Sequence, residues 1–285
     1  MRRIRGAAIT FSTALLLSGC SMPALTPKGP IARAERDLLF DALGLMMIVA
    51  IPVFIMAFVF ATRYRTSNRK ARYTPDWSFS LGIEALVWLV PALIIVALGY
   101  LVWTATHRLD PYEALASTVE PVKVQVVAQD WKWLFIYPEQ KVAVVNELVF
   151  PSEAPLSLDI TSDTVMNAFF IPELGGQIYA MAGMRSHLNL LADEPGTFQG
   201  RNTQYSGDGF PHQHFKAVAT TREAFDAWVE EVRQSSQELD AGTYQKLAEP
   251  TIGHSVTYYS NVEPDLFRKV IAKYAARTTG ARGAE

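Results

Sequence analysis

Two long apolar runs dominate the hydrophobic pattern of the first half of the chain. They cover residues 38–62 and 81–106, and each exceeds the roughly 20 residues that a helix needs to cross about 30 Å of hydrocarbon. Pro52 and Pro91 lie inside them, but membrane helices tolerate proline because neighbouring groups can satisfy the freed carbonyl. The pattern therefore predicts a transmembrane hairpin over residues 38–106.

The connector between the two runs, residues 63–80, is basic. Its first acid is Asp76, which follows five cations: Arg63, Arg65, Arg69, Lys70 and Arg72. Short cationic loops stay on the cytoplasmic side of a membrane. Both ends of the hairpin are then expected outside.

The first nineteen residues have the pattern of a secretory signal, with a cationic start, a short apolar run and small residues before Cys20. The segment Leu17-Ser18-Gly19-Cys20 resembles the bacterial lipobox, whose cysteine is acylated and becomes the new N-terminus. Cys20 is the only cysteine of the chain, so it forms no internal disulfide. We expect a lipoprotein signal peptide over 1–19, a lipid such as palmitate on Cys20 and a periplasmic segment over 20–37, with an unmodified thiol as the alternative.

Alternation with a period of two begins after a Pro-bounded linker over 107–121. Val122, Val124 and Val126 fall on one face of a strand, with polar residues between them. Further short runs follow, separated by proline and glycine, as far as residue 220. This pattern of short strands separated by turn residues predicts an all-β sandwich over 122–220, which is long enough to bury its own core.

The period changes to that of a helix after the sandwich. Thr220 and Glu223 fit a capping box, and apolar residues at helical spacing follow them. Pro264 opens a second amphipathic stretch. We expect a small helical arm over 221–285, which either caps the sandwich or docks on another protein.

Composition agrees with a hairpin and one external domain. The chain has 285 residues and a net charge of −2, and its mean hydropathy is +0.10. This is too apolar for an ordinary soluble protein and too polar for a bundle of many membrane helices. Because the net charge is near zero and the cations cluster in the connector, nucleic acid is excluded as a partner.

Three segments carry a family resemblance. They are residues 83–91 (IEALVWLVP), 129–133 (QDWKW) and 162–172 (SDTVMNAFFIP). Together with the order of signal, hairpin, sandwich and arm, they resemble subunit II of the haem–copper respiratory oxidases. The resemblance implies a cupredoxin-like sandwich in the periplasm of a bacterial inner membrane. It also implies that subunit I, other subunits and membrane lipids are the partners, and that subunit I holds the haems and catalytic copper.

The positions that bind copper in the cytochrome c oxidases of that family hold other residues here. Asn167 stands where the family has the first histidine. In the segment 200–213, Asn202 and Ser206 occupy the thiolate positions, Phe210 the second histidine and Gln213 the methionine. A cupredoxin copper site depends on soft thiolate, and His212 and His214 are too few for a closed site. We therefore expect no cofactor and no metal in this chain.

Loss of the copper ligands on a retained framework resembles the quinol oxidase branch, and the arm resembles that of cytochrome bo-type ubiquinol oxidases. The resemblance implies a non-catalytic subunit of a proton-pumping oxidoreductase that passes electrons from ubiquinol to oxygen. Trp131 and Trp133 would lose their electron-entry role and pack the sandwich against subunit I.

Two other functions stay open. One is a membrane-tethered periplasmic lipoprotein that binds a ligand, which predicts that no haem copurifies with the chain. The other is subunit II of a cytochrome c oxidase with a degenerate copper site, which predicts turnover with reduced cytochrome c.

Glu84 is the ionisable residue best placed to act. It lies near the cytoplasmic end of the second run, where an acid is costly unless it reaches headgroups or serves a proton path. A glutamate at this distance before the proline marks, in the family, the mouth of a proton-uptake channel in subunit I. Asp41, near the outer end of the first run, is expected to be a helix N-terminal acid.

Overall fold

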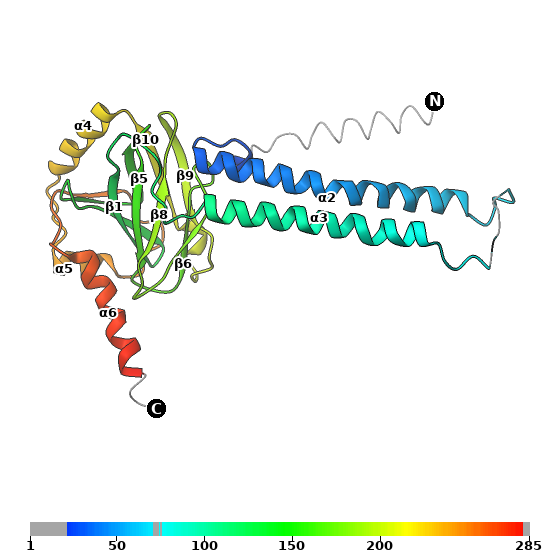
Figure 1. Ribbon diagram of the computed structural model, residues 1–285. Helices are drawn as coiled ribbons and strands as arrows, with labels where there is room; N and C mark the ends of the chain where they lie inside the picture. Colours follow the sequence, from blue (N-terminus) through cyan, green and yellow to red (C-terminus); the bar gives the residue numbers. More distant parts are fainter. Residues whose placement is uncertain (1–21, 71–73, 75, 282–285) are drawn as a thin grey trace, which may run out of the picture. The chain divides into compact units, whose positions relative to one another are not determined.

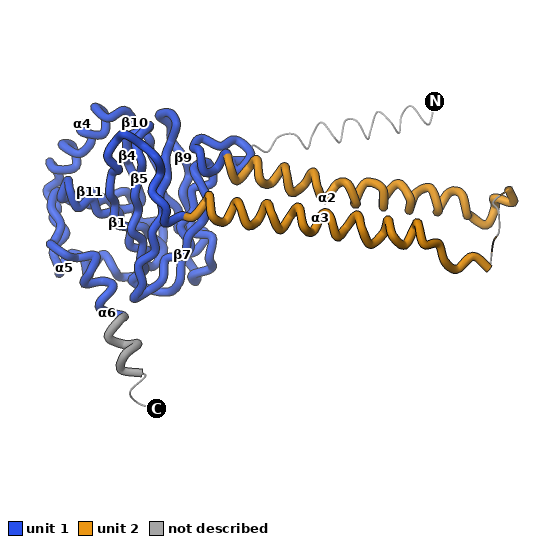
Figure 2. The backbone as a smooth tube through the Cα atoms, in the orientation of Figure 1, with its two compact units in different colours: residues 1–33, 111–285 blue, residues 34–110 orange. Residues whose placement is uncertain are grey.

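The computed structural model describes residues 22–70, 74 and 76–281, with side chains through Tyr274. The chain divides into two compact units (Figure 2): one comprises residues up to Arg33 and from Pro111 onward, and the other comprises residues 34–110. The expected signal peptide and Cys20 lie outside the described residues.

Two long helices form the smaller unit and lie side by side (Figure 1). They are α2 (Pro30–Arg63) and α3 (Leu81–Arg108). Their most apolar windows have mean hydropathies of 2.7 and 2.6, and neither window is buried. Both helices are thus long and apolar enough to cross a membrane, as the sequence predicts.

Helix α2 begins eight residues before the apolar run, because Pro30 suits the first turn of a helix and nothing up to Arg63 breaks it. Asp41 therefore lies about three turns inside the helix, and the first turn contains no acid. The expectation that Asp41 is a helix N-terminal acid is wrong.

The larger unit contains a sandwich of two mixed sheets (Figure 1). The first has the order β11-β3-β2-β1-β5-β8, with bounds β11 (Thr257–Tyr259), β3 (Val142–Val145), β2 (Lys132–Tyr137), β1 (Val122–Gln129), β5 (Leu156–Ser162) and β8 (Ser186–Leu190). The second has the order β4-β10-β9-β6-β7, with bounds β4 (Glu147–Pro151), β10 (His214–Thr220), β9 (Gly196–Asn202), β6 (Asn167–Phe170) and β7 (Ile178–Ala180). The pairs β1–β5 and β4–β10 are parallel.

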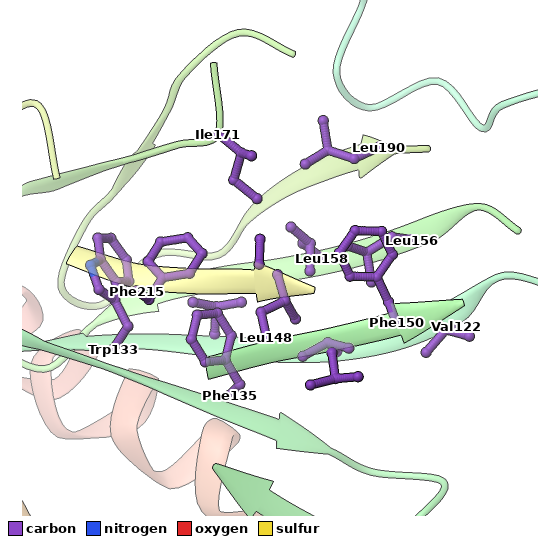
Figure 3. Close-up of a cluster of buried hydrophobic side chains, with 14 of the residues drawn as sticks. Val122, Trp133, Phe135, Leu148, Phe150, Leu156, Leu158, Ile171, Leu190 and Phe215 are labelled. Carbon is purple, nitrogen blue, oxygen red and sulfur yellow. The ribbon is translucent and has the colours of Figure 1, made fainter. Parts of the chain in front are cut away.

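The inner faces of the two sheets meet in an apolar core (Figure 3). Val122, Val124 and Val126 of β1 all point into it, as their alternation predicts. The ring of Phe169 stacks on Phe215 with centroids 5.0 Å apart. Burial of each such ring contributes about 1.5–3 kcal/mol, so this core holds the loops at the end of the sandwich in place.

Helix α4 (Arg222–Arg233) follows directly after β10. Its N-cap is Thr221, whose Oγ1 accepts a hydrogen bond from the backbone N–H of Ala224 at 3.3 Å. Thr220 is still paired in the sheet as the last residue of β10, so the predicted cap is displaced by one residue.

The segment after α4 is not purely helical. It contains the short helix α5 (Ala241–Leu247), strand β11, and helix α6 (Leu266–Ala281). Strand β11 extends the first sheet by pairing with β3. Together these elements cover the outer face of that sheet and form a second apolar cluster, which comprises Val127, Leu134, Ile136, Ala143, Val145, Leu239, Tyr244, Leu247, Tyr259, Leu266, Phe267 and Val270. The arm therefore packs on the sandwich of its own chain.

Candidate functional site

Four of the five positions that the resemblance pairs with copper ligands meet at one end of the sandwich. Asn167 begins β6 and Asn202 ends β9, and these two strands are antiparallel neighbours. Ser206 and Gln213 follow in the loop that leads to β10. Asn167, Asn202 and Gln213 are buried.

These side chains hydrogen-bond directly to one another. Nδ2 of Asn202 donates to Oδ1 of Asn167 at 2.8 Å and to Oε1 of Gln213 at 2.8 Å. The hydroxyl of Ser206 donates to the same Gln213 oxygen at 2.9 Å. These four residues thus form one polar cluster, which we call the amide network (Asn167, Asn202, Ser206 and Gln213).

The remaining atoms of the amide network bind the backbone. Oδ1 of Asn202 accepts from the N–H of Ala168 at 2.8 Å and from that of Gln204 at 3.0 Å. Nε2 of Gln213 donates to the carbonyl of Gln129 at 3.2 Å, and Nδ2 of Asn167 donates to the carbonyl of Val165 at 2.8 Å. Because buried polar groups are costly unless they are paired, this network ties together the segments that converge at this end.

The donor set does not fit the copper centre of the family. Its amide and hydroxyl groups are neutral, and copper in a cupredoxin site is held chiefly by soft thiolate and imidazole. The oxygens that could face a metal already accept hydrogen bonds within the network. Across the described residues, no group of three or more His, Cys, Asp or Glu side chains is placed to hold a metal ion. His212 and His214 are both exposed.

Phe210 is not part of the amide network. It begins a short 3₁₀ turn, η2 (Phe210–His212), and its ring lies 5.8 Å from that of Tyr205. The family position for the second histidine therefore faces a neighbouring aromatic side chain in the same loop.

The two tryptophans of the QDWKW segment have different environments. Trp131 lies in the tight turn between β1 and β2 with φ 65°, and its indole N–H donates to the carbonyl of Ser206 at 3.1 Å. A Cβ on Gly209 would come within 2.2 Å of the Trp131 ring, so only glycine permits this contact. Trp131 thereby packs against the loop that contains Ser206.

Trp133 is fully buried in the core between Phe169 and Phe215. The expectation that it packs the sandwich against another subunit is wrong. Trp131 lies in the hairpin turn itself, whereas Trp133 lies in β2, which starts at Lys132, and its side chain is directed into the core.

A second polar cluster, which sequence patterns do not reveal, joins the arm to the sandwich. Asp163 is buried, and its carboxylate accepts from Nζ of Lys273 at 2.7 Å and from the hydroxyl of Tyr244 at 2.8 Å. Partial burial alone would lower the pKa of Lys273, but the hydrogen bond and charge of Asp163 outweigh it and raise that pKa. Asp163 and Lys273 are 110 residues apart, so only the tertiary structure brings them together.

Lys132 is also buried and also binds the arm. Its ammonium donates to the carbonyl of Glu249 at 2.7 Å, and burial lowers its pKa. A lysine at the start of the otherwise apolar strand KWLFIY is the sequence signal that could have indicated such a contact, since a buried charge requires partners.

Glu84 lies in the first turn of α3. The indole N–H of Trp88, one turn further on, donates to its Oε1 at 3.1 Å. The carboxylate is thus oriented by one neighbour and otherwise exposed within the described unit.

Comparison with known proteins supports the resemblance seen in the sequence. The model of the family "Cytochrome C oxidase subunit II, periplasmic domain" matches residues 133–219, and that of the "COX Aromatic Rich Motif" matches residues 233–277. Cytochrome bo(3) ubiquinol oxidase subunit 2 of Pseudomonas putida is 53% identical over 272 residues, which are 95% of this chain and 87% of the relative. The chain belongs to the ubiquinol oxidase subunit 2 family.

Further members of the ubiquinol oxidase subunit 2 family give the same result. Ubiquinol oxidase subunit 2 of Acetobacter aceti is 48% identical and covers 92% of this chain and 86% of its own length. Quinol oxidase subunit 2 of Bacillus anthracis is 36% identical, and the match covers 89% of this chain and 88% of that relative. The periplasmic-domain match contains the whole amide network, and the aromatic-rich match contains α5, β11 and most of α6.

Proposed function

We propose that this chain is a non-catalytic subunit of a proton-pumping ubiquinol oxidase, a membrane complex that passes electrons from ubiquinol to oxygen. The observation that supports this most is the amide network, because neutral amides and a hydroxyl at the former ligand positions offer no group that changes oxidation state. Electrons then have no entry port through the sandwich, which suits a donor that reacts inside the membrane.

The cofactors belong, in this proposal, to other parts of the complex. Subunit I holds the haems and the catalytic copper, and ubiquinol binds to the complex rather than to this chain. The role of the chain is to support subunit I and other subunits through its hairpin and its sandwich. The amide network and the Asp163 cluster keep the sandwich rigid for that purpose.

The topology follows from charge. The basic connector between α2 and α3 stays in the cytoplasm, so the N-terminal segment and the sandwich are in the periplasm of a bacterial inner membrane. A lipid on Cys20 supplements an anchor that the two helices already provide.

Glu84 is the residue of this chain that we assign to proton uptake. It lies at the end of α3 that adjoins the basic connector, which is the side from which protons are taken up. Among the described residues, the side chain of Trp88 donates a hydrogen bond to one oxygen of the carboxylate and so orients it, and we assign proton exchange to the other oxygen. In this role it is the entry to the uptake channel of subunit I.

A quinol-driven oxygen-uptake assay tests the proposal. The complex is purified through a tag on this chain, and its haem absorption and its rates with a ubiquinol analogue and with reduced cytochrome c are measured. We expect haem, and oxygen uptake with quinol alone. Turnover with cytochrome c would favour a degenerate cytochrome c oxidase, and a haem-free preparation would favour the membrane-tethered binding protein.

A further inference from the structure

A groove of about 500 Å³ lies between α2 and α3, the two helices that run side by side in the smaller unit (Figure 1). Asp41, Gly44 and Ile48 line it on α2, and Ala97 and Tyr100 line it on α3. Its other lining side chains are apolar. A Cβ built on Gly44 would meet no atom within 4 Å, so the helix surface is hollow at this glycine and the groove is accessible from outside the hairpin.

The groove lies where the hydrocarbon of a bilayer gives way to headgroups. Arg63 ends α2 at the basic connector, and at a rise of 1.5 Å per residue Asp41 lies about 33 Å from it along the helix. Tyr100 lies about 29 Å along α3 from Leu81. Because the hydrocarbon core is about 30 Å thick, both polar side chains are at its boundary. Ile48 lies roughly 10 Å deeper than Asp41, so the groove runs from the headgroup level into the hydrocarbon.

Asp41 gives the groove a negative charge at the headgroup level. The ion pair closest to it along α2 joins Arg36 to Asp37 at 2.8 Å, and no cation of the described residues pairs with Asp41 itself. An ionisable group at a membrane is costly unless it finds a partner or reaches water. A ligand that brings a positive charge to this level is therefore favoured.

We propose that the groove binds phosphatidylethanolamine, a phospholipid with a primary ammonium headgroup. The ammonium pairs with the carboxylate of Asp41, the phenol of Tyr100 donates to the phosphate, and an acyl chain lies along Gly44 and Ile48. An anionic headgroup is repelled by Asp41, and a choline headgroup has no N–H to donate to it. The inference requires only that α2 and α3 span a membrane, so it goes beyond the proposed oxidase function.

The dimensions of the groove favour a lipid chain over a helix of another subunit. A volume of about 500 Å³ spread over roughly 10 Å of helix length gives a cross-section of roughly 50 Å². A helix with its side chains is about 10 Å wide and has a cross-section of roughly 80 Å². The groove is thus too narrow to seat a helix, whereas an acyl chain fits along it. A charged upper end and an apolar lower end match a single molecule that has a polar head and an apolar chain.

Photo-crosslinking tests which lipid the groove binds. The full-length chain, with the subunits that copurify with it, is placed in phosphatidylcholine nanodiscs. These contain a photoactivatable phosphatidylethanolamine, or a phosphatidylglycerol with the same acyl chains. Proteolysis and mass spectrometry locate the adducts. At residues 40–48 and 97–101, we expect ethanolamine adducts to exceed glycerol adducts about fivefold, the ratio that one partly solvated ion pair provides.

Substitutions separate the charge of the groove from its shape. Asp41→Asn keeps the size of the side chain and removes its charge, so the two lipids should give equal adducts, whereas Asp41→Glu should retain the preference. Gly44→Leu should lower the yield of ethanolamine adducts at least about fivefold, because its side chain fills the groove. Gly99→Leu is the matched control and should leave the yield unchanged. A Cβ on Gly99 also meets no atom within 4 Å, but Gly99 does not line the groove.

Equal adducts from the two lipids in the unsubstituted chain would overturn the inference, and so would equal yields from Gly44→Leu and Gly99→Leu. Absence of lipid adducts at these residues would show that another subunit covers the groove. Displacement of the lipid by an equimolar ubiquinol analogue would assign the groove to a quinol and would also refute the lipid site. A chain that selects phosphatidylethanolamine but copurifies without haem would refute the proposed function alone.

Discussion

Asn202 connects more groups than any other member of the amide network. Asn202→Ala would remove the acceptor of the Ala168 and Gln204 N–H groups and the donor to Asn167 and Gln213. The Ala168 N–H and Oδ1 of Asn167 belong to buried residues, so each would lose its hydrogen bond to Asn202 without direct access to solvent.

The cost can be estimated from these two groups. A buried donor or acceptor without a partner costs about 1–3 kcal/mol, and a water that enters the space left by the amide recovers part of it. We expect a loss of about 3 kcal/mol in the free energy of unfolding. For a unit of this size, that corresponds to a decrease in Tm of roughly 6–12 °C.

Thermal unfolding of the full-length chain in detergent, followed by the fluorescence of its tryptophans, measures this decrease. Gln199→Ala is the matched control, because Gln199 is an exposed amide on the same strand. Its free energy of unfolding should change by no more than about 0.5 kcal/mol. If both variants unfold at the same temperature, the amide network does not stabilise the sandwich and the reasoning fails.

Four further predictions concern the proton path, the lipid, the metal and the arm. Glu84→Ala should slow quinol oxidation per haem, while Glu84→Asp should retain part of the rate; equal rates in both and in the parent would mean that the acid only reaches the interface. Cys20→Ser should abolish lipid labelling and leave the chain in the membrane, and an unchanged mass after lipid removal would contradict acylation of this residue. Copper added to the purified chain should produce no intense charge-transfer band, so a purple or blue product would show that the donor set has been misjudged. Because Asp163 raises the folded-state pKa of Lys273, the stability from this pair is complete below about pH 10.5, the ordinary lysine value, and is lost as pH rises through the folded-state pKa. The rate of proteolysis of the arm should therefore increase as pH rises above about 10.5. Lys273→Met should abolish this increase of the rate with pH.

Local patterns were sufficient to predict the hairpin, the sandwich and its inward-facing valines. Hydrophobic length and period are properties of residues close together in the chain, so they predict α2, α3 and the alternation of β1 without knowledge of any partner. These patterns predicted the ends of helices less accurately, because the residues that flank an apolar run decide where the helix begins. Helix α2 extends back to Pro30, and the cap of α4 is Thr221.

The sequence resemblance pairs Asn167, Asn202, Ser206 and Gln213 with copper-ligand positions, but it does not predict the hydrogen bonds that these residues form. Asn167 and Asn202 are 35 residues apart, and they meet because β6 and β9 pair with a particular register. The same holds for Asp163 and Lys273, and for β11, which joins a sheet whose neighbouring strand ends more than a hundred residues earlier. Strand register and the docking of the arm depend on the packing of the whole core, since many pairings satisfy the same local alternation. Only the tertiary structure therefore determined that these amide and hydroxyl side chains close into a hydrogen-bonded network and that Trp133 lies in the core.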